Sequence, residues 1–178
     1  MKFLAPWVCI ASLTIFGTAV AADTAKPVVQ VLMQTKVNPM GLALWDITNP
    51  AIGSDGNLDP KMISATQWAR LLEIGKALEE AGRTLATTGG VVAALPGAKL
   101  QDEGAAAAAS KAADVQRYLN AKPAVFRTHA LALQKTGASV VTAATRKDLK
   151  ILSDVSNGLD EVCEKCHVIF WYPQLAKR

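Results

Sequence analysis

Four long stretches of this chain repeat apolar residues at intervals of three and four, which is the spacing of one helix face. They run from about 27 to 47, 64 to 87, 123 to 145 and 148 to 172. Strand signals are scarce between them, and the connections are short at most corners. We therefore predict an all-α fold, an antiparallel four-helix bundle that forms one domain.

The ends of these helices carry recognisable signals. Ser64 and Gln67 have the spacing of a capping box, and Thr145 and Asp148 can cap the last helix. Pro39 lies inside the first stretch, where it lacks a donor and restrains the residue before it. We expect Asn38 to cap a second segment that begins at Pro39, so that the first helix is bent or split.

A long connection separates the second and third main helices. It contains an alanine run at 105–109, and we expect residues 101–120 to form an extra helix in the loop before the third main helix. The alanine run indicates helix propensity alone, and the sequence assigns no role to the insertion at 98–122.

The N-terminus resembles a secretory signal. Lys2 precedes an uncharged apolar run from Phe3 to Val20, and Ala19-Val20-Ala21 resembles a cleavage site. We expect residues 1–22 to be removed and residues 23–178 to form the mature domain, exported to the periplasm without a stable membrane anchor. Cleavage leaves 18 basic and 15 acidic residues, a formal charge of +3, with no basic cluster that would bind nucleic acid.

Residues 163–167, Cys-Glu-Lys-Cys-His, fit the C-x-x-C-H signature of covalent c-type haem attachment. Cysteines three apart share a helix face, so both sulfurs of Cys163 and Cys166 can reach vinyl groups on one porphyrin edge. His167 would then be the proximal iron ligand. Because these are the only cysteines of the mature chain, we expect one haem c per chain.

The same residues allow three other interpretations. A redox dithiol requires a lowered thiol pKa at a helix start, whereas this pair falls late in a predicted helix. A structural zinc site requires four ligands, and the mature chain offers only Cys163, Cys166, His167 and the distant His129. A disulfide within one helical turn would be strained.

A C-x-x-C-H motif close to the C-terminus, on the last helix of an exported four-helix chain, resembles the class II c-type cytochromes, the cytochrome c′ group. Phe170 matches the aromatic residue that usually follows the ligand histidine by three, whereas Trp171 replaces the basic residue that is common next. The resemblance implies that the distal residue comes from the first helix. Met33 is the expected distal ligand and Met40 the runner-up, with core packing as the alternative for both.

Further residues could approach the porphyrin. His129 could provide a second histidine ligand or pack near the haem. The aromatic side chains at Trp45, Trp68 and Phe126 could pack against the ring or belong to the core, and the cations at Lys36 and Arg70 could pair with propionates. Small residues on inward faces, Gly75, Gly82 and Thr136, are expected to leave room for the haem.

Electron transfer is the expected function: a six-coordinate iron would cycle between two oxidation states without a substrate pocket or catalytic acid–base pair. The expected partners are exported redox proteins, with a homodimer possible, and no enzyme activity is expected. The alternative is a five-coordinate haem protein that binds nitric oxide or carbon monoxide, because high-spin members of the resembled group place an apolar side chain at the distal position.

Overall fold

The computed structural model describes residues 25–87, 89–101, 103 and 110–173, and within these ranges the protein is all-helical, without a strand. The all-α prediction is confirmed. Residues 1–22, expected to be a signal peptide, and the alanine run at 105–109 lie outside the described residues. The elements are α1 (Val29–Leu32), a π-helix (Met33–Val37), α2 (Asn38–Thr48), two 3₁₀ turns (Asn49–Ala51 and Pro60–Met62), α3 (Ala65–Leu85), α4 (Ala112–Ala121), α5 (Pro123–Arg146) and α6 (Leu149–Phe170).

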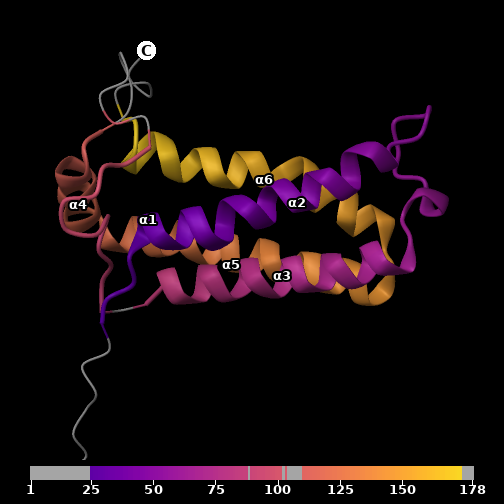
Figure 1. Cartoon of the computed structure of the whole chain (residues 1–178), viewed down its shortest axis with the longest axis horizontal. Helices are drawn as coiled ribbons and strands as arrows, with labels where there is room; N and C mark the ends of the chain where they lie inside the picture. The colour runs from indigo at the N-terminus through magenta and orange to yellow at the C-terminus, as the bar shows by residue number, and fades with distance from the viewer. Residues whose placement is uncertain (1–24, 88, 102, 104–109, 174–178) are drawn as a thin grey trace, which may run out of the picture.

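The long helices α2, α3, α5 and α6 run side by side along the longest axis of the molecule, and α1 continues the line of α2 (Figure 1). Helix α4 lies at one end, next to the C-terminal end of α6 (Figure 1). No described helix is long and apolar enough to cross a membrane.

The first helix is continuous but changes its hydrogen-bond pattern. The expectation that Asn38 caps a new segment is wrong, because Asn38 has helical angles (φ −62°, ψ −49°) and its side chain makes no capping bond. Its backbone N–H instead donates to the carbonyl of Met33, five residues earlier, which is the π-helical pattern. Pro39 cannot donate to the preceding turn, and the wider π turn directly before it accommodates this loss without ending the helix.

Local capping positions the other long helices as predicted. The capping box of α3 is present: Gln67 N donates to Ser64 Oγ (3.2 Å), and Ser64 N donates to Gln67 Oε1 (2.8 Å). Helix α5 begins at Pro123, a favourable first-turn residue. Lys147 turns the chain with a left-handed backbone (φ 53°), and Asp148 caps α6 by accepting from Ile151 N (3.0 Å).

The insertion before α5 contains a shorter helix than predicted. Gln101 and Glu103 lie in turns, and α4 begins only after Lys111, whose backbone is extended. Long-range bonds compete with helix formation here, since the backbone nitrogen of Ser110 donates to the carbonyl of Trp171 (2.9 Å). Further upstream, the carbonyl of Val92 accepts a hydrogen bond from the backbone N–H of Val29 (2.8 Å), which connects the loop to the start of α1.

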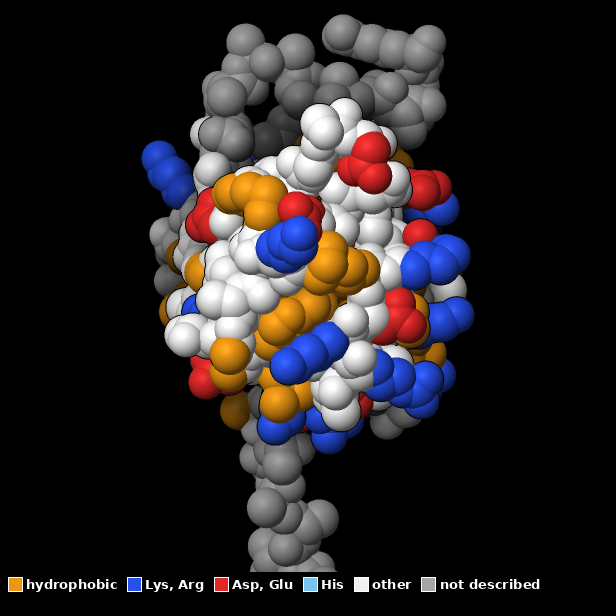
Figure 2. All heavy atoms as spheres, turned by 90° about the vertical axis from the view of Figure 1, so that its right-hand side faces the viewer, with side chains coloured by type: hydrophobic (Ala, Val, Ile, Leu, Met, Phe, Trp, Pro, Cys, Tyr) orange, Lys and Arg blue, Asp and Glu red, His pale blue; other side chains and the backbone are white. Residues whose placement is uncertain are grey.

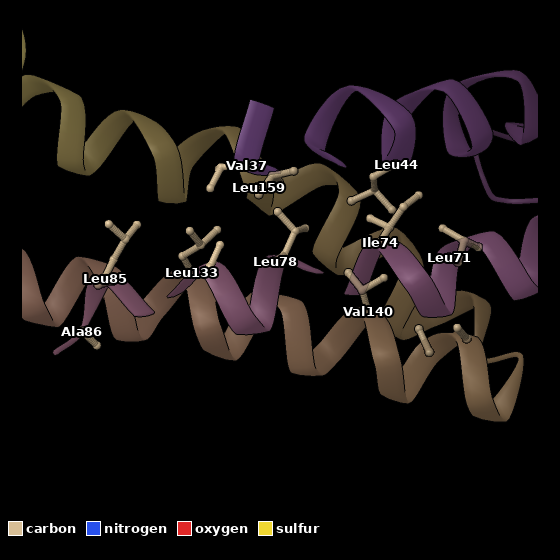
Figure 3. Packing of buried hydrophobic residues seen from close by; sticks show 14 of the residues in the cluster. Val37, Leu44, Leu71, Ile74, Leu78, Leu85, Ala86, Leu133, Val140 and Leu159 are labelled. Carbon is tan, nitrogen blue, oxygen red and sulfur yellow. The ribbon is translucent and has the colours of Figure 1, made fainter. Parts of the chain in front are cut away.

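The core lies between the four long helices, where side chains such as Leu44, Ile74 and Leu159 point into one interior space (Figure 3). The predicted inward face of α3 is buried throughout, at Trp68, Leu71, Gly75, Leu78, Gly82 and Leu85. This apolar burial is the main force that holds the bundle together.

Glycines bring α3 and α5 into backbone contact. A Cβ atom at Gly75 would lie 2.7 Å from Val141 N, and one at Gly82 would lie 2.7 Å from Gln134 Cα. The expectation that these glycines leave room for a cofactor is therefore wrong, because the backbone of the neighbouring helix already fills the space. The hydroxyl of Thr136 donates to the carbonyl of Ala132 in its own helix (3.0 Å).

The end of the molecule opposite α4 is formed by the connections between α2 and α3 and between α5 and α6 (Figure 1). Figure 2 shows apolar side chains in the middle of this face, with Lys and Arg side chains around them. Ile52 and Met62, from the α2–α3 connection, are 47% and 49% exposed. The candidate site lies at the other end.

Candidate functional site

A pocket opens between the π-helix, the end of α3, the first half of α5 and the last two turns of α6. Its empty space is about 410 Å³, a figure that includes the part open to solvent. Apolar side chains dominate its lining, and the few groups that can ligate a metal stand among them. The lining residues are Met33, Val37, Leu85, Phe126, His129, Ala130, Leu133, Val162, Cys163, Cys166 and His167.

Helix α6 presents the complete C-x-x-C-H motif to this pocket. Cys163 and Cys166 are free thiols on one face of the helix and are half-buried. Burial, with smaller contributions from Asp160 and Glu164, raises the pKa of Cys163, and burial raises the pKa of Cys166 to about 12. Both thiols are therefore protonated at neutral pH.

His167 follows directly and lines the same pocket. Burial lowers the pKa of its imidazole, and the nearby carboxylates of Glu164 and Asp160 oppose that shift without reversing it. The ring is therefore neutral near pH 7, the form in which a histidine binds a metal. It packs edge-on against Trp171, with 5.0 Å between ring centroids, and against Tyr172 at 5.9 Å.

The wall across from α6 is formed by the π-helix. Met33 begins this helix and lines the pocket, so the structure brings the preferred methionine to the C-x-x-C-H motif although 130 positions separate it from Cys163. Met40, the runner-up, packs against the core but does not line the pocket. Val37, four residues after Met33, is buried and also lines it.

Helix α5 supplies two further side chains to the pocket that the sequence had singled out. Phe126 packs edge-on against Phe170, with 5.5 Å between ring centroids, and His129 contacts the same ring at 6.5 Å. Burial lowers the pKa of His129, and the positive charge of Lys165 lowers it further. His129 is therefore a neutral group at the edge of the pocket.

Four other candidates do not line the pocket. The indole of Trp45 donates to the carbonyl of Ser156 (3.0 Å), and Trp68 is a buried core residue. Both tryptophans therefore contribute to the packing of the bundle and not to the pocket. Arg70 pairs with Glu73 (2.9 Å) at the surface, and Lys36 is exposed.

Sequence reasoning missed the contacts around the end of α6. The hydroxyl of Tyr172 donates to the carboxylate of Glu164, inside the motif. The indole N–H of Trp171 and the hydroxyl of Ser110 are buried without a hydrogen-bond partner among the described residues. The only signal for the first contact is that Glu164 and Tyr172 lie eight residues apart, about two helical turns.

Among the described residues, no three His, Cys, Asp or Glu side chains converge in an arrangement that could hold a metal ion by themselves. No protein-family model matches this chain, and no curated protein or solved structure matches it significantly.

Proposed function

We propose that this chain belongs to the exported haem proteins in which a four-helix bundle with antiparallel neighbours holds one covalent haem c. Within that class, we propose that it is an electron-carrying cytochrome of the c′-like type. The observation that carries the proposal is the pocket itself: a methionine from the first helix and the complete C-x-x-C-H motif from the last helix line one apolar cavity.

The residues present fit a covalently attached haem. Two half-buried thiols three residues apart lie on the pocket side of α6, beside a neutral imidazole. Phe126, Leu133 and Val162 provide the apolar surroundings that a porphyrin requires. Cys163 and Cys166 would form the two thioether bonds, His167 would be the proximal iron ligand, and Met33 would be the distal one. When bound, the haem iron supplies a one-electron couple between its ferric and ferrous states.

The alternatives to haem attachment fit less well. A redox dithiol requires a thiol whose pKa is lowered, whereas burial raises the pKa of both Cys163 and Cys166. The described residues also lack a further ligand that converges with these thiols, as a structural zinc site requires.

The protein's own groups would set the properties of the couple. An apolar lining excludes water and lowers the local dielectric constant, and a thioether from Met33 would favour the ferrous state. We propose that the mature domain acts in the periplasm, without enzyme activity, and exchanges electrons with exported redox proteins. A homodimer is compatible with this role.

Val37 supports a second candidate function. It is buried on the same side of the pocket as Met33, and an apolar side chain at the distal position would leave the iron five-coordinate. The protein would then bind nitric oxide or carbon monoxide. The two functions differ in whether the Met33 sulfur binds the iron.

The test begins with expression in a host that attaches c-type haem. We expect one haem per chain that survives acid–acetone extraction, and we expect the Cys163→Ala, Cys166→Ala double variant to lose it. Haem that extracts freely from the unaltered protein, or zinc in its place, would contradict the proposal.

Substitution of the methionines then separates the two functions. If Met33 binds the iron, Met33→Ala should abolish the near-infrared band of His–Met ligation, speed carbon monoxide binding and lower the reduction potential. Met40→Ala is the matched control and should change none of these properties, because Met40 does not line the pocket. Rapid carbon monoxide binding by the unaltered protein, with no effect of Met33→Ala, would favour the gas-binding function.

A further inference from the structure

The chain turns sharply where α6 ends, and the turn is centred on His167. The backbone N–H groups of Trp171 (2.8 Å) and Tyr172 (3.0 Å) both donate to the carbonyl of His167. These two hydrogen bonds to one carbonyl end the helix and fold the two aromatic residues back over the histidine. Their rings consequently contact the imidazole at centroid distances of 5.0 Å and 5.9 Å.

A side-chain bond closes this turn. The hydroxyl of Tyr172 donates to the carboxylate of Glu164, which lies between the two cysteines of the motif. Burial, together with the hydrogen bond to Glu164, raises the pKa of Tyr172, so the phenol remains a donor throughout the neutral range. The residue that follows Cys163 is thus tied to the residue that covers His167.

Trp171 lies in the same turn, with its ring centroid 6.1 Å from that of Tyr172. Its indole N–H is buried but has no acceptor among the described residues, so no side-chain hydrogen bond orients the ring. Its backbone carbonyl accepts from Ser110 N (2.9 Å), which fixes the main chain from the opposite side. The indole is therefore held by packing between a fixed backbone and the closed turn.

The imidazole of His167 makes its ring contacts with Trp171 and Tyr172. Metal-ligating histidines are normally oriented by a hydrogen bond from the second ring nitrogen to a carboxylate or carbonyl. In this structure two aromatic rings contact the imidazole.

We propose that Trp171 and Tyr172, closed by the Tyr172–Glu164 hydrogen bond, are positioning residues that fix the plane of the His167 imidazole. The inference rests on the proposed haem function, because it concerns the proximal ligand of that site. Opening the bond frees the tyrosine ring, relaxes the indole and lets the imidazole rotate. The orientation of an axial histidine changes the unpaired-spin distribution over a ferric haem, so the methyl resonances of the haem report it directly.

The experiment uses the haem-loaded chain and four single variants. Tyr172→Phe removes only the hydroxyl, whereas Glu164→Ala removes the acceptor together with its negative charge. Glu164→Gln removes the same charge but keeps a carbonyl acceptor, so the comparison of Ala with Gln at this position isolates the hydrogen bond. Tyr118→Phe, at the only other tyrosine, is the matched control because Tyr118 lies on α4 and does not contact His167.

We expect Tyr172→Phe and Glu164→Ala to shift the haem methyl resonances in the same direction. In these resonances the double variant should shift no further than either single variant, because both remove one bond. The resonances of Glu164→Gln should lie close to those of the unaltered protein, and Tyr118→Phe should be indistinguishable from it. The reduction potential of Glu164→Ala is compared with that of Glu164→Gln, because both lack the charge of Glu164.

The outcomes of this experiment distinguish an error in the positioning role from an error in the proposed haem function. A chain without covalent haem would overturn both. Variants that carry one haem per chain, keep their circular dichroism and show unchanged methyl resonances and potential would overturn the positioning role alone. Additive shifts in the double variant would also overturn it, since they would mean that the two side chains act separately.

Discussion

Gly137→Ala tests the claim that α3 and α5 touch through their backbones. A Cβ atom at this position would lie 2.7 Å from both Glu79 Cα and the carbonyl oxygen of Gly75. Non-bonded carbon atoms prefer separations of about 3.5–4.0 Å, so the helices would have to part by roughly 1 Å. Such a gap weakens dispersion contacts along the whole helix pair, because rigid helices separate together.

The expected cost follows from two opposing effects. Overpacking of a close-packed interior costs about 1–3 kcal/mol, and a clash with backbone belongs at the upper end because backbone cannot change rotamer. Alanine favours the helix over glycine by about 0.8–1.0 kcal/mol, which offsets part of that loss. We expect Gly137→Ala to destabilise the protein by about 2 kcal/mol.

Gly158→Ala is the matched control for this substitution. Gly158 also lies within a long helix, α6, but a Cβ atom there would meet nothing within 4 Å. Only the helix-propensity effect remains, so this variant should gain about 0.8–1.0 kcal/mol. Gly137→Ala and Gly158→Ala are therefore expected to change the free energy of unfolding in opposite directions.

Urea unfolding followed by circular dichroism measures both free energies, and the slope with denaturant shows whether the transition remains comparable. For a domain of this size, 1 kcal/mol corresponds to about 2–4 °C in Tm. A Gly137→Ala variant as stable as the unaltered protein would refute the backbone contact. Equal losses in both variants would mean that helical glycines in this chain serve some purpose other than close approach.

Two further predictions concern capping and thiol reactivity. Ser64→Ala should cost about 1 kcal/mol by removing the capping box of α3, whereas Thr66→Ala in the same exposed turn should not, as paired thermal melts would show. In haem-free protein at pH 8, Cys166 should react with iodoacetamide far more slowly than it does after unfolding. A thiol of pKa about 12 is ionised in roughly one molecule in 10⁴ at that pH, against roughly one in four for an ordinary cysteine, and equal rates before and after unfolding would refute the burial.

The parts of the fold that depend on neighbouring residues were predictable from the sequence. The capping box at Ser64 and the cap at Asp148 use atoms within three residues, so composition and spacing are enough. The apolar faces of α3, α5 and α6 were predictable for a similar reason, since a periodic stripe has only one face to bury.

The errors occurred where distant segments decide the local structure. A sequence shows that Gly75 and Gly82 lie on an inward face, but only the partner helix determines whether a cavity or a backbone faces them. Helix α4 is shorter than its propensity suggested because Ser110 bonds to Trp171, far along the chain. Asn38 is a residue type that favours caps, yet its backbone N–H donates to the carbonyl of Met33 in a π turn and the helix continues.

The candidate site shows the same division. The C-x-x-C-H motif predicted three pocket residues because its spacing is itself the chemical requirement. Met33 and Met40 lie seven residues apart, a spacing that on a regular α-helix would give them nearly the same direction. A π turn takes one residue more than an α turn, so the two methionines lose that common register, and only Met33 lines the pocket.

The two walls of the pocket differ in how firmly they are held, and this difference bears on the function. Ala130 and Leu133 lie on the stretch of α5 against which Gly82 is packed, so close backbone contact fixes that wall. Met33 instead begins a short π-helix, a weaker pattern of hydrogen bonds that occurs frequently at functional sites. Because the α5 wall of the pocket is fixed, the π-helix wall is the one that can move. Any adjustment that moves the Met33 sulfur toward or away from a bound iron should therefore occur in the first helix, while the α3–α5 pair stays in place.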